Sequence, residues 1–296
     1  MGIKGLKNLI RKYAPDAINP FDMNTLVGKR VAVDSSILLY KFRYLYTEPD
    51  FHIRGFKAKV EEFQRMGILP IFVFDGTPPD AKKHTLSKRN DTKNKMKDRL
   101  VALEESLSEC PEIPNVDEFI DSGSESDTDV EVKKIKKIKS EITKIKKNLL
   151  YVHKFHSTEV ILFLKSIGIP FFESSGEAEE TCVALQKSGR VDYILTEDTD
   201  SLAFGGTNIL FNNGTEHVSL DLVLQGFGIS MDSFIDLCIL CGCDYTCTIP
   251  RVGPVTAYRK IKELGSIEAA FETIPENFNY ILSRELFKQN DSFDLI

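Results

Sequence analysis

The sequence lacks any run of 18 or more consecutive apolar residues, so no stretch is long enough to cross a bilayer as a single helix. Its first residues, MGIKGLKNLIRKYAP, lack the long apolar core of a secretory signal peptide. Leu6 stands where N-myristoylation requires Ser or Thr. These absences argue against membrane-spanning, secreted and lipid-anchored classes, and we expect a soluble intracellular protein with no membrane partner.

Cysteine and histidine are also scarce, with six and five in 296 residues. Four cysteines lie in LCILCGCDYTC, a layout unlike a secreted disulfide framework and unlike the usual zinc-ligand spacings. We expect them to be buried as small apolar side chains in a reducing compartment. The histidines offer one close pair, His153 and His156, which we expect at the surface.

Positive charge is in deficit overall, since the net charge is -6. Residues 104–132, however, contain eleven acids and no Lys or Arg, and without them the chain would carry about +5. Lys-rich and Arg-rich clusters flank this block on both sides, at 82–99 and 133–147. Each cluster is a solvated helix face or, next to a carboxylate site, a surface for a polyanion.

Short apolar or β-branched runs alternate with helical patterns along the chain. The strand-like runs are RVAVDSS, ILPIFVFDG, IPFFESS and VDYILTEDTD, and the helical stretches include FKAKVEEFQRMG and HSTEVILFLKSIG. This alternation predicts an α/β fold with a parallel-rich central sheet flanked by helices. In such sheets the functional groups gather at the carboxyl ends of the strands.

The middle of the chain breaks this pattern. Residues 104–132 are rich in Pro, Ser and acids, a composition typical of a disordered insertion. The next segment, KKIKKIKSEITKIKKNLL, places apolar residues at alternating spacings of three and four, which predicts one apolar stripe on a Lys-rich helix. Its lysines either lie in water or form a basic wall beside the site.

Carboxylates are crowded at the ends of the predicted strands. Two groups of like charge at such short spacing are stable when they share hard divalent cations, and magnesium prefers carboxylate, water and phosphate oxygens. The candidate ligands are Asp34, Asp75, Glu177, Glu179, Asp198, Asp200 and Asp244.

Six segments in fixed order resemble the flap endonuclease or XPG family of structure-specific 5′ nucleases. They are MGIKGL, VAVDSS with Tyr40 beyond it, FVFDGTPPDAKKHTLSKR, GIPFFESSGEAEETCVAL, TEDTDSLAFG and LCILCGCDYTCTIPRVGP. The resemblance implies a PIN-like nuclease fold with a helical arch and a C-terminal helix-two-turn-helix. It divides the chain into an N-terminal nuclease region (1–103), the acidic insertion in the arch (104–132), an internal nuclease region (133–235) and a DNA-binding region (236–296).

The resemblance also implies a two-metal mechanism with two Mg²⁺ ions, for which Mn²⁺ can substitute. Asp34, Asp75, Glu177 and Glu179 would serve one ion, and Asp198, Asp200 and Asp244 the other. Lys82 and Arg89 fall where the family steers the scissile phosphate. Contacts to DNA would come from Tyr40, Lys59, Gly242, Arg251 and Gly253.

The chain departs from the family in three places. Arg251-Val252-Gly253 replaces the Gly-hydrophobic-Gly turn that grips duplex DNA, and Val255-Thr256 replaces a basic pair. The stretch between Asp34 and Asp75 is short, and we find no sliding-clamp motif. From the family we expect a monomer in the nucleus, or in the host nucleus if the protein is viral.

Three functions are compatible with these residues. The first is a magnesium-dependent 5′ endonuclease or 5′-3′ exonuclease of DNA replication or repair, cutting 5′ flaps or, alternatively, bubbles or junctions. The second is a magnesium phosphohydrolase of small esters with Asp198 as nucleophile, which leaves Asp34 and the Glu pair unexplained. The third is a catalytically silent binder of DNA junctions, which seven intact carboxylates disfavour.

Overall fold

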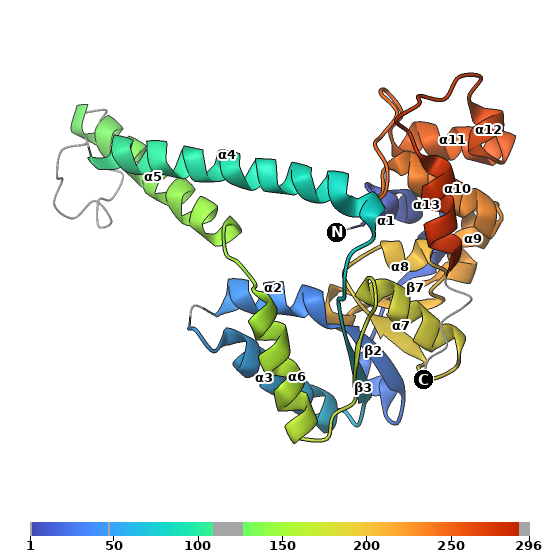
Figure 1. Ribbon diagram of the computed structural model, residues 1–296, viewed down its shortest axis with the longest axis horizontal. Coiled ribbons are helices and arrows are strands. Elements are labelled where there is room, and N and C mark those ends of the chain that lie inside the picture. The colour runs from blue at the N-terminus through green and yellow to red at the C-terminus, as the bar shows by residue number, and fades with distance from the viewer. Residues whose placement is uncertain (1, 47, 109–126, 290–296) are drawn as a thin grey trace. The chain divides into compact units, whose positions relative to one another are not determined.

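The computed structural model describes residues 2–46, 48–108 and 127–289. The chain forms two compact units, one of Met1–Thr85 with His153–Ile296 and one of Leu86–Val152. The first unit holds the sheet and the second holds most of two long helices (Figure 1).

The first unit is built on a sheet that, in the described part of the chain, has seven strands in the order β1-β7-β6-β5-β2-β3-β4. Strands β6, β5, β2, β3 and β4 run parallel, and β7 and β1 are antiparallel to their neighbours. This confirms the predicted parallel-rich α/β sheet. The strands are β1 (Ile18–Pro20), β2 (Arg30–Asp34), β3 (Leu69–Phe74), β4 (Phe171–Glu173), β5 (Tyr193–Leu195), β6 (Asn208–Phe211) and β7 (Glu216–Ser219).

Helices cover both faces of this sheet (Figure 1). Helices α2 (Ser35–Leu45), α3 (Phe51–Arg65) and α6 (Lys154–Ser166) pack together on one face, and α7 (Ala178–Lys187) lies on the other. Helices α1 (Leu6–Tyr13) and α9 (Leu220–Phe227) contact each other at the β7 end. Because both faces are covered, successive residues Val31, Ala32 and Val33 of β2 are all buried.

The C-terminal part of this unit is helical. It contains α8 (Asp200–Ala203), α10 (Met231–Cys241), α11 (Pro254–Leu264), α12 (Ile267–Ala270) and α13 (Tyr280–Lys288). Helix α11 begins at Pro254, and the missing N–H of proline has no cost there because the first N–H groups of a helix have no partner within the helix. Within the described ranges no single helix is long and apolar enough to cross a membrane; α9 and α10 meet that criterion only as a pair bent by 86°.

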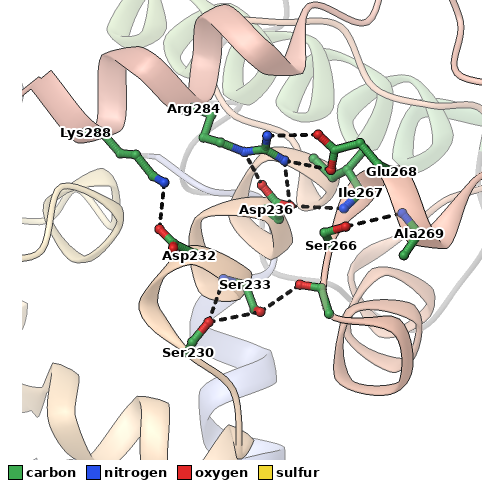
Figure 2. A network of polar contacts seen from close by, with 11 residues as sticks. Ser230, Asp232, Ser233, Asp236, Ser266, Ile267, Glu268, Ala269, Arg284 and Lys288 are labelled. Carbon is green, nitrogen blue, oxygen red and sulfur yellow. Dashed lines mark hydrogen bonds and ion pairs between the residues drawn. The ribbon is translucent and has the colours of Figure 1, made fainter.

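A polar network fastens α13 to α10 and α12 (Figure 2). The Arg284 guanidinium donates to both oxygens of Asp236, at 2.8 Å each, and to both oxygens of Glu268, at 2.9 and 3.1 Å. Asp236 also accepts the backbone N–H of Ile267 at 3.0 Å. Lys288 pairs with Asp232 nearer the surface. The hydrogen bond from Arg284 lowers the pKa of Glu268 to about 2.

The second unit contains most of α4 (Lys83–Ser108) and all of α5 (Asp127–Asn148), which cross and pack against each other (Figure 1). The predicted apolar stripe on α5 is confirmed, since Ile142 and Ile145 pack against Leu103 of α4. Ion pairs join Arg99 to Glu141 and Lys146 to Glu104 across the two helices.

The ends of the acidic segment 104–132 are helical, because α4 extends to Ser108 and α5 begins at Asp127. We expected disorder throughout this segment. The helices extend into it because apolar residues at its borders find partners: Leu107 packs against both Val132 and the stripe at Leu103. Residues 109–126, where the rest of the expected disorder falls, lie outside the described residues.

Candidate active site

Carboxylates from four strands gather at one edge of the sheet. Asp34 is the last residue of β2, Asp75 follows β3, and Asp198 lies shortly after β5. Glu177 and Glu179 follow β4 at the start of α7. Because β5, β2, β3 and β4 are parallel neighbours, their carboxyl ends share that edge. The structure therefore places these five candidate residues at the same edge of the sheet.

Asp34 is held by hydrogen bonds on both oxygens. Its Oδ1 accepts the backbone N–H groups of Ser36 and Ile37, at 3.2 and 3.3 Å, and thereby caps α2. Its Oδ2 accepts the Thr196 hydroxyl at 2.9 Å. Burial, together with the nearby Asp75 charge, raises the pKa of Asp34 to about 7. The carboxylate is fixed in orientation, and its negative charge is costly without a nearby cation.

Asp198 and Asp200 lie in one tight turn. Asp198 N–H donates to the Thr196 hydroxyl at 3.0 Å, and Asp198 Oδ1 accepts the Asp200 N–H at 3.0 Å. The Ser201 hydroxyl donates to the Asp198 carbonyl at 2.7 Å. Burial raises the pKa of both carboxyls, and for Asp200 the neighbouring Asp198 adds to the effect. Among the described residues, Asp200 Oδ1 is buried and receives no hydrogen bond.

Two glycines allow the backbone to approach this edge closely. Gly2 has a φ of +85°, and a Cβ there would collide with carboxylate oxygens of Asp198 and Asp200. A Cβ on Gly76 would collide with the Ser174 carbonyl oxygen, because the segment after β3 lies against the turn before α7. Larger residues at either position would displace the turns that carry the carboxylates.

The start of α7 brings the glutamates into the group. Asp75 Oδ1 accepts the Ala178 N–H at 2.9 Å and so satisfies one of the free donors of the helix. The Ser174 hydroxyl donates to the Glu177 carbonyl at 3.0 Å. Burial, followed by the charge of Asp34, raises the pKa of Glu179 well above its usual value. The two glutamates are thus attached to a firmly bonded turn.

Lys82 supplies a cation inside this acidic group. Its ammonium donates to Glu177 Oε1 and lies 3.2 Å from Asp244 Oδ2, which brings the seventh carboxylate to the site. Burial tends to lower the pKa of Lys82, but Glu177 and then Asp244 raise it above its usual value. Lys82 therefore stays charged and partly offsets the repulsion between the carboxylates.

Tyr245 completes the site. Its buried hydroxyl donates to Glu177 Oε2, opposite the oxygen that Lys82 contacts. Burial, with Glu177 second, raises the pKa of Tyr245 well above its usual value, so the hydroxyl remains a donor. Neither Tyr245 nor Thr196 was expected at the site, although Tyr245 directly follows Asp244 and Thr196 is the first residue of TEDTD.

The donor chemistry of this edge fits hard divalent cations. All seven candidate side chains offer carboxylate oxygens, and the buried Oδ1 of Asp200 has no hydrogen-bond donor within the described residues. In that same part of the chain no three His, Cys, Asp or Glu side chains form a ready metal site as they stand. The Lys82 ammonium lies between Glu177 and Asp244 instead.

The expected substrate contacts lie in different environments. Tyr40 is 50% exposed on α2, and Arg89 is exposed on α4 in the second unit. Arg251 is exposed with a φ of 64°, a left-handed conformation that glycine adopts easily and other residues rarely adopt. Gly253 caps α11 with open space around its Cα, whereas Gly242 is buried at the end of α10, where its carbonyl accepts the Lys4 N–H.

Two expectations need correction. Lys59 is only 4% exposed and donates to Glu62 and Asn213, so its ammonium does not lie where DNA could reach it. His156 is buried, not at the surface, because its ring packs against Phe51 on α3.

The remaining groups fit what we expected of them. Glu197, which we read as a supporting or surface residue, accepts the backbone N–H groups of Asn212 and Asn213. The thiols of Cys238, Cys241 and Cys243 are buried, and burial raises the pKa of Cys241 and Cys243 to about 12. They therefore pack as small apolar side chains, while Cys247 is partly exposed.

Comparison with known proteins adds independent observations. Residues 1–96 match the XPG N-terminal domain and residues 168–244 match the XPG I-region. Flap endonuclease 1 of Ostreococcus lucimarinus is 33% identical over 99% of this chain and 75% of its own, and that of Drosophila grimshawi is 34% identical over the same shares.

Solved structures share the fold. The catalytic core of Rad2 in complex with DNA substrate has a TM-score of 0.68 at 22% identity, covering 97% of this chain and 86% of its own. Flap endonuclease-1 from Methanococcus jannaschii has a TM-score of 0.60 at 22% identity, covering 92% of this chain and 81% of its own.

Proposed function

The chain belongs to the XPG family of structure-specific 5′ nucleases, to which the flap endonucleases belong, and from this premise we propose that it cuts DNA at junctions between single strand and duplex with Mg²⁺. As a structure-specific nuclease it is a hydrolase.

One observation carries the proposal: the seven carboxylates converge at one sheet edge with the partly buried ammonium of Lys82 among them. We assign Asp34, Asp75, Glu177 and Glu179 to one Mg²⁺, and Asp198, Asp200 and Asp244 to the other. When bound, the two ions supply a Lewis acid for the scissile phosphate and a water of lowered pKa. Mn²⁺ offers the same chemistry.

The remaining residues act on the DNA. Lys82 is charged and lies beside the carboxylates, so it can exchange its contact with Glu177 or Asp244 for one with a phosphate oxygen as charge develops there. Arg89 is assigned the same task from α4. Exposed Tyr40 can stack on an unpaired base, and Arg251 and Gly253 would approach the duplex backbone.

The biological setting follows from the family. We assign the protein to DNA replication or repair in the nucleus, or in a host nucleus if it is viral, and to action as a monomer. A 5′ flap is the first candidate substrate, because the flap endonucleases match over nearly the whole chain. Bubbles and four-way junctions remain alternatives, since junction-resolving GEN1 shares the fold at a TM-score of 0.54.

The test uses end-labelled 5′-flap, bubble, four-way-junction and single-stranded DNA, with and without Mg²⁺. We expect cleavage that needs Mg²⁺ and is fastest on the flap. Asp200→Asn removes charge without volume and should lower turnover at least about a hundredfold while flap binding persists. Near-wild-type cleavage by this variant would contradict the metal assignment, and hydrolysis of p-nitrophenyl phosphate in place of DNA would favour the phosphohydrolase.

A further inference from the structure

We propose that Tyr245 is a positioning residue that holds the Glu177 carboxylate ready for metal binding, and that the C-terminal helix α13 keeps Tyr245 in place. The inference rests on the proposed metal-binding function of Glu177. It assigns a role to a buried tyrosine that contacts Glu177 and to a helix outside the sheet.

Glu177 has a fixed backbone but a side chain that needs restraint. Its carbonyl is bonded by Ser174, and the turn that carries it is joined to the segment after β3 by the Gly76 N–H. The side chain itself is buried, with Lys82 on Oε1 and Tyr245 on Oε2. A lysine has a flexible stem, whereas a packed tyrosine ring does not, so the tyrosine sets the carboxylate orientation.

A pocket of about 490 Å³ beside Glu177 shows why restraint is required. Phe204, Tyr245 and Leu286 help to line it, and Glu177 lies on its wall. Without the tyrosine hydroxyl, Oε2 would lose its donor and the carboxylate could turn toward this space. A ligand that samples several orientations binds a metal more weakly than one that is already placed.

The ring of Tyr245 is fixed by two phenylalanines. Its centroid lies 5.2 Å from that of Phe287 and 6.5 Å from that of Phe204, both edge-on, and the two phenylalanines are 5.1 Å apart. Edge-to-face packing at these separations is favourable and directional. All three rings are buried, which leaves Tyr245 one orientation for its hydroxyl.

Phe287 is in turn held by the network on α13. It lies one helical turn after Arg284, whose guanidinium is clamped by Asp236 of α10 and Glu268 of α12 (Figure 2). Helix α10 ends at Cys241, just before the candidate ligand Asp244. One assembly of helices therefore supports both Asp244 and, through Phe287 and Tyr245, Glu177.

The experiment measures metal binding directly, without DNA. Mn²⁺ is titrated into wild type, Tyr245→Phe and Tyr258→Phe, and free Mn²⁺ is followed by its electron paramagnetic resonance signal. Tyr258 is a matched control, a buried tyrosine whose hydroxyl donates to the Phe227 carbonyl. Loss of a hydrogen bond to a metal ligand typically weakens affinity 10–100-fold, so we expect about tenfold weaker binding by Tyr245→Phe and less than about twofold change in Tyr258→Phe.

Two further measurements separate positioning from general damage. Excess Mn²⁺ should restore the single-turnover cleavage rate of Tyr245→Phe, and its flap affinity in Ca²⁺ should equal that of wild type. Phe287→Leu keeps the hydroxyl but loosens the ring, and we expect a smaller loss of Mn²⁺ affinity, about two- to threefold. If Tyr245→Phe does not fold, this second variant still tests the proposal.

The outcomes distinguish this inference from the proposed function. Equal Mn²⁺ affinity in wild type and Tyr245→Phe would overturn the role of Tyr245 and leave the proposed nuclease mechanism intact. Unchanged affinity in Phe287→Leu would overturn the role of α13. If wild type and Asp200→Asn bound Mn²⁺ equally weakly, the metal assignment itself would fail.

Discussion

Arg284 is the centre of the network in Figure 2, and its replacement by methionine should strongly destabilise the first unit. Methionine keeps much of the length and apolar character of the stem but removes the guanidinium. Asp236 is 3% exposed in its side chain, so its charge would be buried with the Ile267 N–H as its remaining donor among the contacts described above. The substitution therefore removes one partner of a buried ion pair and leaves the other partner charged.

The expected magnitude follows from the two carboxylates. Breaking a buried pair typically costs about 3–5 kcal/mol, because the partner charge stays buried without compensation. Glu268 is 48% exposed in its side chain, so its bonds to Arg284 add no more than about 1 kcal/mol. For a unit of this size such a loss lowers Tm by roughly 10 °C.

The assay is thermal and urea denaturation followed by far-ultraviolet circular dichroism. Lys288→Met is the matched control, since it removes a cation from the same helix whose partner Asp232 is 76% exposed in its side chain. It should cost less than about 0.5 kcal/mol. If Arg284→Met were no more destabilising than Lys288→Met, the reasoning about the Asp236 charge would be refuted.

The other predictions concern acid, phosphate and the DNA-binding turn. The pKa of Glu268 is lowered in the folded state, so its contribution to folding stability is present above about pH 4.5 and is lost as pH falls toward about 2. In acid denaturation, the stability difference between wild type and Glu268→Gln should therefore vanish over that range. Arg89→Ala should slow single-turnover cleavage more than it weakens flap binding, and a change in affinity alone would make Arg89 a duplex anchor. Arg251→Gly relieves the strain of an arginine in the left-handed conformation but increases the entropy of the unfolded chain, so stability should change by less than about 1 kcal/mol. The salt dependence of DNA binding should fall by about one phosphate contact, and an unchanged salt slope would contradict a phosphate contact at Arg251.

The carboxylate edge was predictable because it depends on chain direction alone. Acids after β-branched runs fall at the carboxyl ends of parallel strands, whichever way the side chains later pack. Thus Asp34, Asp75 and Asp198 could be grouped from spacing. The partners that orient them could not, since Thr196 and Tyr245 meet Asp34 and Glu177 only after distant segments come together.

Burial of polar residues was the main source of error. Lys59 has the spacing of a surface cation on α3, yet its ammonium is enclosed by Glu62 and by Asn213 from the loop after β6. His156 is buried because α6 packs on α3 and brings its ring against Phe51. Both positions depend on how helices pack, which periodicity within one helix does not reveal.

Two of the candidate ligands also satisfy free N–H groups at the starts of helices: Asp34 caps α2, and Asp75, from a distant segment, accepts the first N–H of α7. An alanine at either position would therefore remove a cap, which costs about 1 kcal/mol, and at the same time relieve repulsion among the acids. The net change in stability is a difference of opposed effects and says little about catalysis. Asparagine keeps the acceptor and removes only the charge, so it is the substitution that separates the two roles. The same restriction applies to natural substitutions at these two positions. A side chain that cannot accept a hydrogen bond would remove a candidate metal ligand and would also loosen the first turn of a helix.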